Sequence, residues 1–304
     1  MKYIDEMIKI PVLEDGDKLY HYTSAAGLQG ICEKEFWVTE RNFLNDRTEF
    51  QIATEIFCEV LESHMIDRER LSVLKEKISK ELRRLETPGK LGEKAAYYGD
   101  YVISFCLDND STLMWAEYSD FMGYCMKFDF QKLLDSFEKS KEILHGKVIY
   151  DHSEQFQLLE EMFEQEILLE PTICEGLTSW KDLDFISHKE IGELVNVVPI
   201  ILSAYNMFFK KPCFSGEHEY RFVFMCTHDG GLGREKDLVS QYFRLKNEVF
   251  IPYVRKRLQS LECLESVLIG PKNNSDIAVK GLEYFFRNKK LSVSVERSQM
   301  PLRY

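Results

Sequence analysis

The chain has 304 residues, of which 44% are hydrophobic and 30% charged, a composition typical of globular proteins rather than disordered or membrane-embedded ones. A chain of this length can bury a sizeable core and forms one large domain or two small ones. The formal net charge of −12 disfavours a surface built for non-specific nucleic-acid binding, which requires clustered Lys and Arg.

The first half of the chain is predicted to alternate short strands with helices. Thr23 and Ser24 are N-cap residue types that open the first helix. Mixed charges at helical spacing over 66–94, with a break at Pro88–Gly89, indicate a solvent-exposed helix. In chain order we predict a strand at 19–22, a helix at 24–31, a strand at 36–39, a turn at 42–46, helices at 49–61 and 66–94, a strand at 101–106, a helical turn at 113–118, and strands at 123–129 and 147–150.

The second half begins with a strongly acidic stretch, 154–193, whose apolar spacing predicts one or two amphipathic helices. The apolar run 194–209 is too short and too often interrupted to span a membrane, and predicts a buried helix. Later elements are predicted as strands at 220–226, 249–253 and 266–269, a helix at 275–287 and a strand at 292–296. This pattern favours a single α+β domain over 1–304, with a mixed β-sheet and helical insertions at about 49–94 and 154–210.

The eight cysteines are widely spaced and include no CxxC pair, so neither a zinc ribbon nor a redox dithiol is indicated. Several lie in apolar segments, where a thiol behaves as a small core side chain. The N-terminus lacks signal-peptide features, and we expect a cytoplasmic protein with reduced cysteines and no membrane partner.

Common catalytic fingerprints are absent from the sequence. It contains no Gly-x-Gly-x-x-Gly after a strand, no Walker-type loop, no His-Glu-x-x-His and no Gly-x-Ser-x-Gly elbow. Three local groups of polar residues remain as candidates for a site.

The first group is His21–Tyr22–Thr23, at a predicted junction of strand and helix. Such a junction exposes a side chain beside free backbone N–H groups and is a usual place for ligand contact. The alternative is a histidine that only caps or packs. The second group is Asn42 and Asn45–Asp46 with Glu49, which lies at capping-box distance from Asp46, so that helix capping alone would explain the spacing.

The third group is Glu217–Arg221, which leads into an apolar strand. Strand alternation places Glu217, Glu219 and Arg221 on one face, and His218 and Tyr220 on the other. Burying such charges is costly unless they pair with each other or serve a ligand. The alternative is an Arg–Glu pair at a sheet edge without further function.

Taken together, these segments resemble a large bacterial family of uncharacterised proteins, a domain of unknown function. The resemblance runs from about residue 18 to the end and is carried by order and spacing. Its motifs stand here as Tyr20–Ser24 with Gly27–Leu28 and Gly30–Ile31, Leu44–Asp46 with Glu49–Phe50, Ser104–Phe105, Trp115, Glu217–Arg221, Ile269–Pro271 and Arg297–Arg303. Family membership by itself says nothing of activity.

A weaker likeness reaches further: a strand ending in His, a helix with Gly-Leu and Ile, and a second strand resemble the opening of His-Tyr-Glu ADP-ribosyltransferases. The resemblance implies a sheet of that type and NAD as substrate. His21 matches the histidine that holds the adenosine ribose, and Glu219, with Glu217 as its rival, matches the late glutamate. Arginine-modifying relatives share a Glu-x-Glu pair but open with Arg. The aromatic residue that stacks on nicotinamide is matched by Tyr118, Trp115 or Tyr124.

On this resemblance we expect catalytic roles for Glu219, Glu217 and His21, and no metal. Cleavage of the nicotinamide–ribose bond develops positive charge on the sugar, which a carboxylate stabilises, while His21 would donate a hydrogen bond to the other ribose. The expected NAD contacts are His21, Tyr22, Thr23, Asn45, Asp46, Ser104, Trp115, Tyr118 and Arg221.

The leading hypothesis is therefore an NAD-dependent ADP-ribosyltransferase, or an NAD glycohydrolase if water is the acceptor. A role as toxin or phage-defence effector, with a regulatory or antitoxin partner, follows from association alone. The acceptor, protein or nucleic acid, stays open; a local basic groove at Arg255–Arg257 and Arg287–Lys290 would suit a nucleic acid.

Two alternatives compete with this hypothesis. One is a metal-dependent phosphodiesterase or nuclease, in which Asp46, Glu49, Glu217 and Glu219 would be oxygen ligands for Mg²⁺ or Mn²⁺. The other is a non-catalytic module that binds a nucleotide or a protein.

Overall fold

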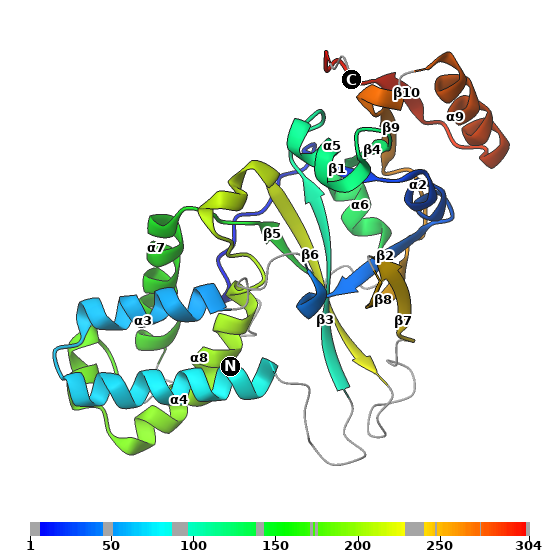
Figure 1. Cartoon of the computed structure of the whole chain (residues 1–304). Helices are drawn as coiled ribbons and strands as arrows, with labels where there is room; N and C mark the ends of the chain where they lie inside the picture. Colours follow the sequence, from blue (N-terminus) through cyan, green and yellow to red (C-terminus); the bar gives the residue numbers. More distant parts are fainter. Residues whose placement is uncertain are drawn as a thin grey trace.

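The computed structural model describes residues 7–44, 51–86, 97–137, 143–170, 173, 176–228, 240–246, 248–273 and 275–301. These residues form an α+β fold around one large mixed sheet (Figure 1). The strands are β1 (Lys18–Thr23), β2 (Glu35–Glu40), β3 (Tyr97–Cys106), β4 (Tyr124–Asp129), β5 (Leu144–Lys147), β6 (Glu219–His228), β7 (Tyr242–Lys246), β8 (Val249–Arg257), β9 (Leu264–Ile269) and β10 (Ser294–Arg297).

The α-helices are α2 (Ala25–Cys32), α3 (Ile52–His64), α4 (Arg68–Glu86), α5 (Thr112–Ser119), α6 (Phe130–Ser136), α7 (His152–Met162), α8 (His188–Tyr205) and α9 (Asp276–Lys289). A π-helical turn, η4 (Phe163–Leu168), continues α7. Short 3₁₀ turns are η1 (Arg41–Phe43), η5 (Trp180–Phe185), η6 (Pro212–Glu217) and η8 (Pro271–Asn273).

Strand β3 lies at the centre of the sheet. The main path runs β10-β9-β4-β1-β3-β2-β8-β7, and β6 with β5 branches from β3. Only the β10–β9 pair is parallel among the strand pairs of the described residues. Along one edge, β3 pairs with β6 over its whole length. This pairing sets Cys106 opposite Glu219 and Ser104 opposite Arg221.

The other edge of β3 is shared by two strands and is interrupted between them. Strand β2 pairs with it at Tyr101 and Val102, whereas β1 pairs with it at Cys106 alone. Residues 103–105 of β3 therefore face a notch between β1 and β2. Backbone groups at such a notch need partners other than a strand.

The two faces of the sheet bury two hydrophobic cores. The helical block α3, α4, α7 and α8 lies against one face, beside β3, β5 and β6 (Figure 1). Helices α2, α6 and α9 contribute to the core of the other face, in which Phe36, Phe105, Phe128 and Phe222 pack edge to face or tilted. Val102 and Val223 of the sheet belong to the core of the helical block, so the two parts share apolar contacts.

The predicted α+β class with helical insertions is confirmed, while the single domain stays a prediction. The 66–94 helix is not simply exposed: α4 packs on α8 and buries Leu71, Leu74, Ile78 and Leu82. The strand predicted at 147–150 is displaced to β5, and 148–150 contributes only an isolated bridge, Ile149 to Phe209. Helix α6 and strand β7 were not predicted; both are short, and the N-cap residue Asp129 that opens α6 was included in the preceding strand.

Helix α8 contains Pro199, is capped by Ser187 and Glu190, and is buried along one side, as the apolar run 194–209 predicts. Among the described residues, no helix combines the length and the apolar character that a membrane span needs. Seven cysteines lie in the described part of the chain, and each of them is a free thiol.

Gly123 allows the start of β4 to approach the end of β1. A Cβ atom at this position would lie 2.3 Å from the Thr23 carbonyl oxygen and 2.5 Å from Ser119 Cβ, whereas a Cβ atom at Gly30 would meet nothing within 4 Å. We expect Gly123→Ala to lower the free energy of unfolding by about 1–3 kcal/mol, because backbone must move. Gly30→Ala, in α2, should be neutral or stabilising by up to about 1 kcal/mol. Urea denaturation of both variants measures this, and equal stability of the two would contradict it.

Candidate functional site

His21 fills the notch between β1 and β2. Its ring nitrogen Nδ1 is 3.1 Å from the backbone carbonyl oxygen of Ser104. The ring also packs against Phe36 and Phe105, with centroids 5.8 and 5.5 Å away. The side chain thus replaces the strand partner that Ser104 lacks at the interruption of the sheet.

The environment of His21 fixes both its charge and its tautomer. A carbonyl oxygen only accepts hydrogen bonds, so Nδ1 carries the proton. Burial lowers the pKa of His21 to about 4. The hydrogen bond to Ser104 raises this pKa in part, and the charge of Arg244 lowers it slightly further. At neutral pH the ring is therefore uncharged, and Nε2 presents a lone pair. In this tautomer Nε2 is the nitrogen left for a ligand, and it would accept a hydrogen bond from a ribose hydroxyl rather than donate one.

A second cluster, of buried charges, lies at the start of β6. Arg221 donates from Nε and Nη2 to the two carboxylate oxygens of Glu219, at 2.9 and 2.8 Å, and from Nη1 to the Met207 carbonyl at 2.8 Å. Lys210 Nζ lies between the acids, bonded to Glu217 and 3.4 Å from Glu219. All four side chains are buried. The bidentate geometry and the two cations offset the cost of burying the carboxylates.

The two carboxyl groups have pKa values displaced in opposite directions. Burial alone would raise the pKa of Glu219, but the charges of Arg221 and Lys210 and the hydrogen bonds of Arg221 and Ser104 lower it to about 2. The pKa of Glu217 is raised, because its desolvation outweighs the effect of Lys210. Two acids in one site with divergent pKa values are the usual arrangement for separate acid–base roles.

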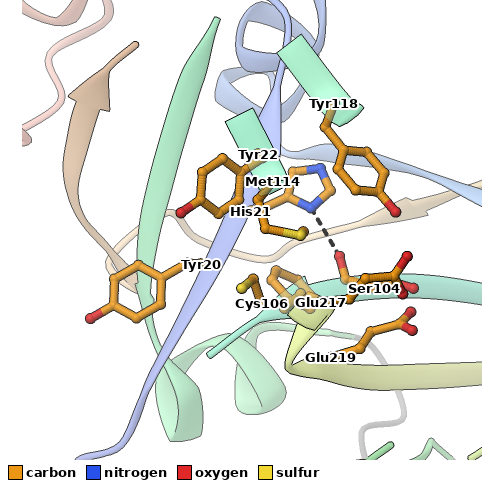
Figure 2. Close-up of a pocket in the computed structure, with 10 residues that line it drawn as sticks. Tyr20, His21, Tyr22, Ser104, Cys106, Met114, Tyr118, Glu217 and Glu219 are labelled. Carbon is orange, nitrogen blue, oxygen red and sulfur yellow. Dashed lines mark hydrogen bonds between the residues drawn. The ribbon is translucent and has the colours of Figure 1, made fainter. Parts of the chain in front are cut away.

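Both clusters open into one cavity of about 40 Å³, which is large enough for one or two water molecules or a hydroxyl-bearing edge of a ligand. Figure 2 shows the Tyr118 ring beside His21, with its hydroxyl directed toward the carboxylates. Tyr118 is 40% exposed, so one part of its ring remains accessible. The cavity is lined by Tyr20, His21, Tyr22, Ser104, Phe105, Cys106, Met114, Tyr118, Glu217 and Glu219.

Glu217 reaches the cavity by a route that differs from the predicted one. It is not on the strand, because η6 ends at Glu217 and β6 begins at Glu219. His218 between them has a left-handed backbone, with φ of 41°, which redirects the chain. The His218 side chain is exposed and contacts Asp108 at 2.6 Å. Strand alternation therefore applies to Glu219 and Arg221 only.

Several residues expected to contact a ligand lie outside the cavity lining. Trp115 is fully buried, donates to Asp110 at 2.7 Å and packs against Tyr22, so its ring is not placed to stack on a ligand. Thr23 and Tyr124 pair with each other across β1 and β4. Arg221 lies behind Glu219 and acts on it directly.

Tyr22 lines the cavity, but its hydroxyl is used within the protein. It donates to the Asp108 carbonyl and accepts from the Ser111 amide, both at 2.9 Å, and so fixes the segment that leads into α5. Ser104 lines the cavity as expected. Asn45, Asp46 and Glu49 lie outside the described residues.

Sequence reasoning missed Lys210, the cation between the acids. The sequence pattern that could have indicated it is a lysine directly after the apolar run Met207–Phe209. A lysine buried there needs an acidic partner. The described residues hold no group of three or more His, Cys, Asp or Glu side chains that could bind a metal ion. Glu217 and Glu219, proposed as ligands in one alternative, are engaged by Lys210 and Arg221.

Residues 114–222 match a family described as a protein of unknown function, DUF2971. The match confirms, over these residues, the predicted relation to a domain-of-unknown-function family. It extends from α5 into β6 and so includes Tyr118, Lys210, Glu217 and Glu219, whereas His21 precedes it. No curated protein and no solved structure matches the chain. The comparisons do not show the likeness to ADP-ribosyltransferases.

The lowered pKa of His21 predicts a pH dependence of stability. Between pH 6.5 and about 4 the unfolded chain binds a proton at His21 that the folded protein does not. The free energy of unfolding therefore decreases as the pH is lowered through this range, by up to about 3 kcal/mol. His21→Asn keeps a donor for the Ser104 carbonyl but does not titrate there. We expect a flatter profile for this variant in urea denaturation at several pH values. Parallel profiles for the two proteins would contradict the assignment.

Lys210 is expected to hold the acid pair together. Lys210→Met leaves two buried carboxylates with one cation and should cost about 3–5 kcal/mol of unfolding free energy. The double variant Lys210→Met/Glu217→Gln removes one of these charges and should recover part of that loss. Thermal and urea denaturation measure both. A double variant no more stable than the single one would contradict the coupling of Lys210 to Glu217.

Proposed function

We propose that this member of a domain-of-unknown-function family is an NAD-dependent ADP-ribosyltransferase, or an NAD glycohydrolase when water is the acceptor. The observation that carries the proposal is that His21, Tyr118 and the Glu217–Glu219 pair line one cavity. These residues come from β1, α5 and the η6–β6 junction, far apart in the sequence. They are the side chains that the proposed chemistry requires.

Glu219 is the group proposed to stabilise the transition state. When the nicotinamide–ribose bond breaks, its electron pair leaves with nicotinamide and the sugar gains oxocarbenium character. A carboxylate with a pKa of about 2 stays ionised throughout and is already oriented by Arg221 and Lys210. Preorganised charges of this kind act on the transition state more than on the ground state. The paired cations reduce the field of Glu219, and its bidentate geometry fixes its position.

Glu217 is the group proposed to handle the proton. The attacking acceptor, an amine, hydroxyl or water, loses a proton as it bonds to the sugar carbon. A carboxylate with a raised pKa accepts that proton better than Glu219 does. The products are the ADP-ribosylated acceptor, or ADP-ribose, with nicotinamide and one proton.

His21 and Tyr118 are proposed to position the substrate. Nε2 of the neutral imidazole accepts a hydrogen bond from a ribose hydroxyl, and the exposed part of the Tyr118 ring offers a face to nicotinamide. A cavity of about 40 Å³ takes one sugar edge and no more. The rest of the dinucleotide would lie across the opening. The toxin or phage-defence role belongs to this proposal, since such an enzyme consumes NAD.

One observation favours a second function, a non-catalytic nucleotide-binding module. Glu219 is already satisfied by Arg221 in a bidentate pair, which is an arrangement that a purely structural ion pair would also adopt. Such a module binds its ligand without product and tolerates Glu219→Gln.

Release of nicotinamide from labelled NAD, with and without candidate protein or nucleic-acid acceptors, tests the proposal. Loss of the charge in Glu219→Gln should lower kcat by roughly 100- to 1,000-fold, with NAD still bound. Glu283→Gln, an exposed acid on α9, is the matched control and should keep full activity. Melting temperatures of all variants separate lost activity from lost folding.

Full turnover by Glu219→Gln at an unchanged melting temperature would remove Glu219 from the mechanism. Absence of turnover, of label transfer and of any NAD-induced thermal shift in the wild-type protein would end the NAD proposal. Binding of NAD without turnover by either protein would favour the binding module.

A further inference from the structure

Arg244 on β7 does not line the cavity itself, but it lies close enough to His21 for its charge to act on that ring, on the side of the notch formed by β2. Its Nη2 atom donates to the Thr39 hydroxyl at 2.8 Å, so its side chain extends across β8 to reach β2. Thr39 is paired with Val102 of β3, directly beside the interrupted segment of that strand. The guanidinium is half-buried, and this desolvation lowers the pKa of Arg244. Its charge also contributes to lowering the pKa of His21.

Not every N–H group of the Arg244 guanidinium has a hydrogen-bond partner within the described part of the chain. Its Nε atom is buried and has no hydrogen-bond partner there. No carboxylate of the described residues lies within 4 Å of it, whereas Arg41 pairs with Asp100, Arg221 with Glu219 and Arg255 with Glu35. An unsatisfied buried donor costs about 1–3 kcal/mol, and on a cationic group more, which calls for an explanation.

Among the described residues, the charged groups at and beside the cavity leave one cation without a matching anion. Glu217 and Glu219 are matched by Lys210 and Arg221, and His21 is uncharged. Arg244 therefore adds a positive charge that these groups leave uncompensated. A partly desolvated cation beside a polar cavity favours an anionic ligand.

We propose that Arg244 is an anion-binding residue beside the cavity, which binds phosphate oxygens of a ligand that extends out of the cavity, through the N–H groups that Thr39 does not use. A guanidinium presents parallel donors that match two oxygens of one phosphate, and Thr39 holds its plane in place. The ligand class is a phosphodiester or diphosphate joined to a sugar that reaches His21. This inference rests on the proposed function when the ligand is NAD, since Arg244 would then bind its diphosphate.

Isothermal titration calorimetry with ADP-ribose, inorganic diphosphate and adenosine tests the site without any need for turnover. For Arg244→Gln we expect the affinity for ADP-ribose and for diphosphate to fall about 10- to 100-fold, as for the loss of a charge-assisted contact, with adenosine affinity unchanged. Arg255→Gln on the neighbouring strand is the matched control, since Arg255 is paired with Glu35 and stacks over Tyr242. It should bind like the wild-type protein.

The outcomes separate this inference from the NAD proposal. Equal affinity of wild type and Arg244→Gln for ADP-ribose overturns the role of Arg244 and leaves the NAD proposal standing. Arg244-dependent binding of diphosphate by a protein that neither binds ADP-ribose nor cleaves NAD supports the anion site and rejects NAD. Failure of the wild-type protein to bind either phosphate compound overturns the inference, as does an equal loss of adenosine affinity in Arg244→Gln.

Discussion

The buried pair of Glu219 and Arg221 is the interaction on which the site depends. A carboxylate can remain ionised away from water only where cations and donors replace its hydration, and Arg221 with Lys210 supplies them. Glu219 is the first residue of β6 and lies opposite Cys106 of β3, so the paired carboxylate stands where the strand meets the cavity.

The interruption of β3 explains how an early histidine meets a late acid pair. Strand β6 occupies one edge of β3 and pairs with Ser104 there, while β1 and β2 share the other edge and leave Ser104 without a strand partner on that side. His21 donates a hydrogen bond to the Ser104 carbonyl, and the Ser104 side chain contributes to the low pKa of Glu219. One residue of the central strand thus connects both halves of the site. The cavity follows from the sheet being incomplete at this point.

Local patterns predicted much of this arrangement. Alternation of side chains along β6 placed Glu219 and Arg221 together, and the apolar run before Lys210 predicted the buried helix. The left-handed backbone of His218 could not be predicted, because it depends on how η6 packs rather than on the residue type. Trp115 illustrates the same limit. A tryptophan near a candidate site can be either a ligand contact or a core residue, and here its hydrogen bond to Asp110 shows that it belongs to the core. The notch in the sheet and the contact of Arg244 with Thr39 could not be predicted either, because both depend on pairing between strands that are far apart in the sequence.

A crystal structure of the Glu219→Gln variant with NAD would show whether the substrate occupies this cavity, since slowed cleavage should trap it. We expect a ribose hydroxyl within hydrogen-bond distance of His21 Nε2, with the nicotinamide-bearing sugar next to position 219 and the ring against Tyr118. NAD bound elsewhere on the molecule, or a cavity filled only by water at saturating NAD, would contradict this expectation.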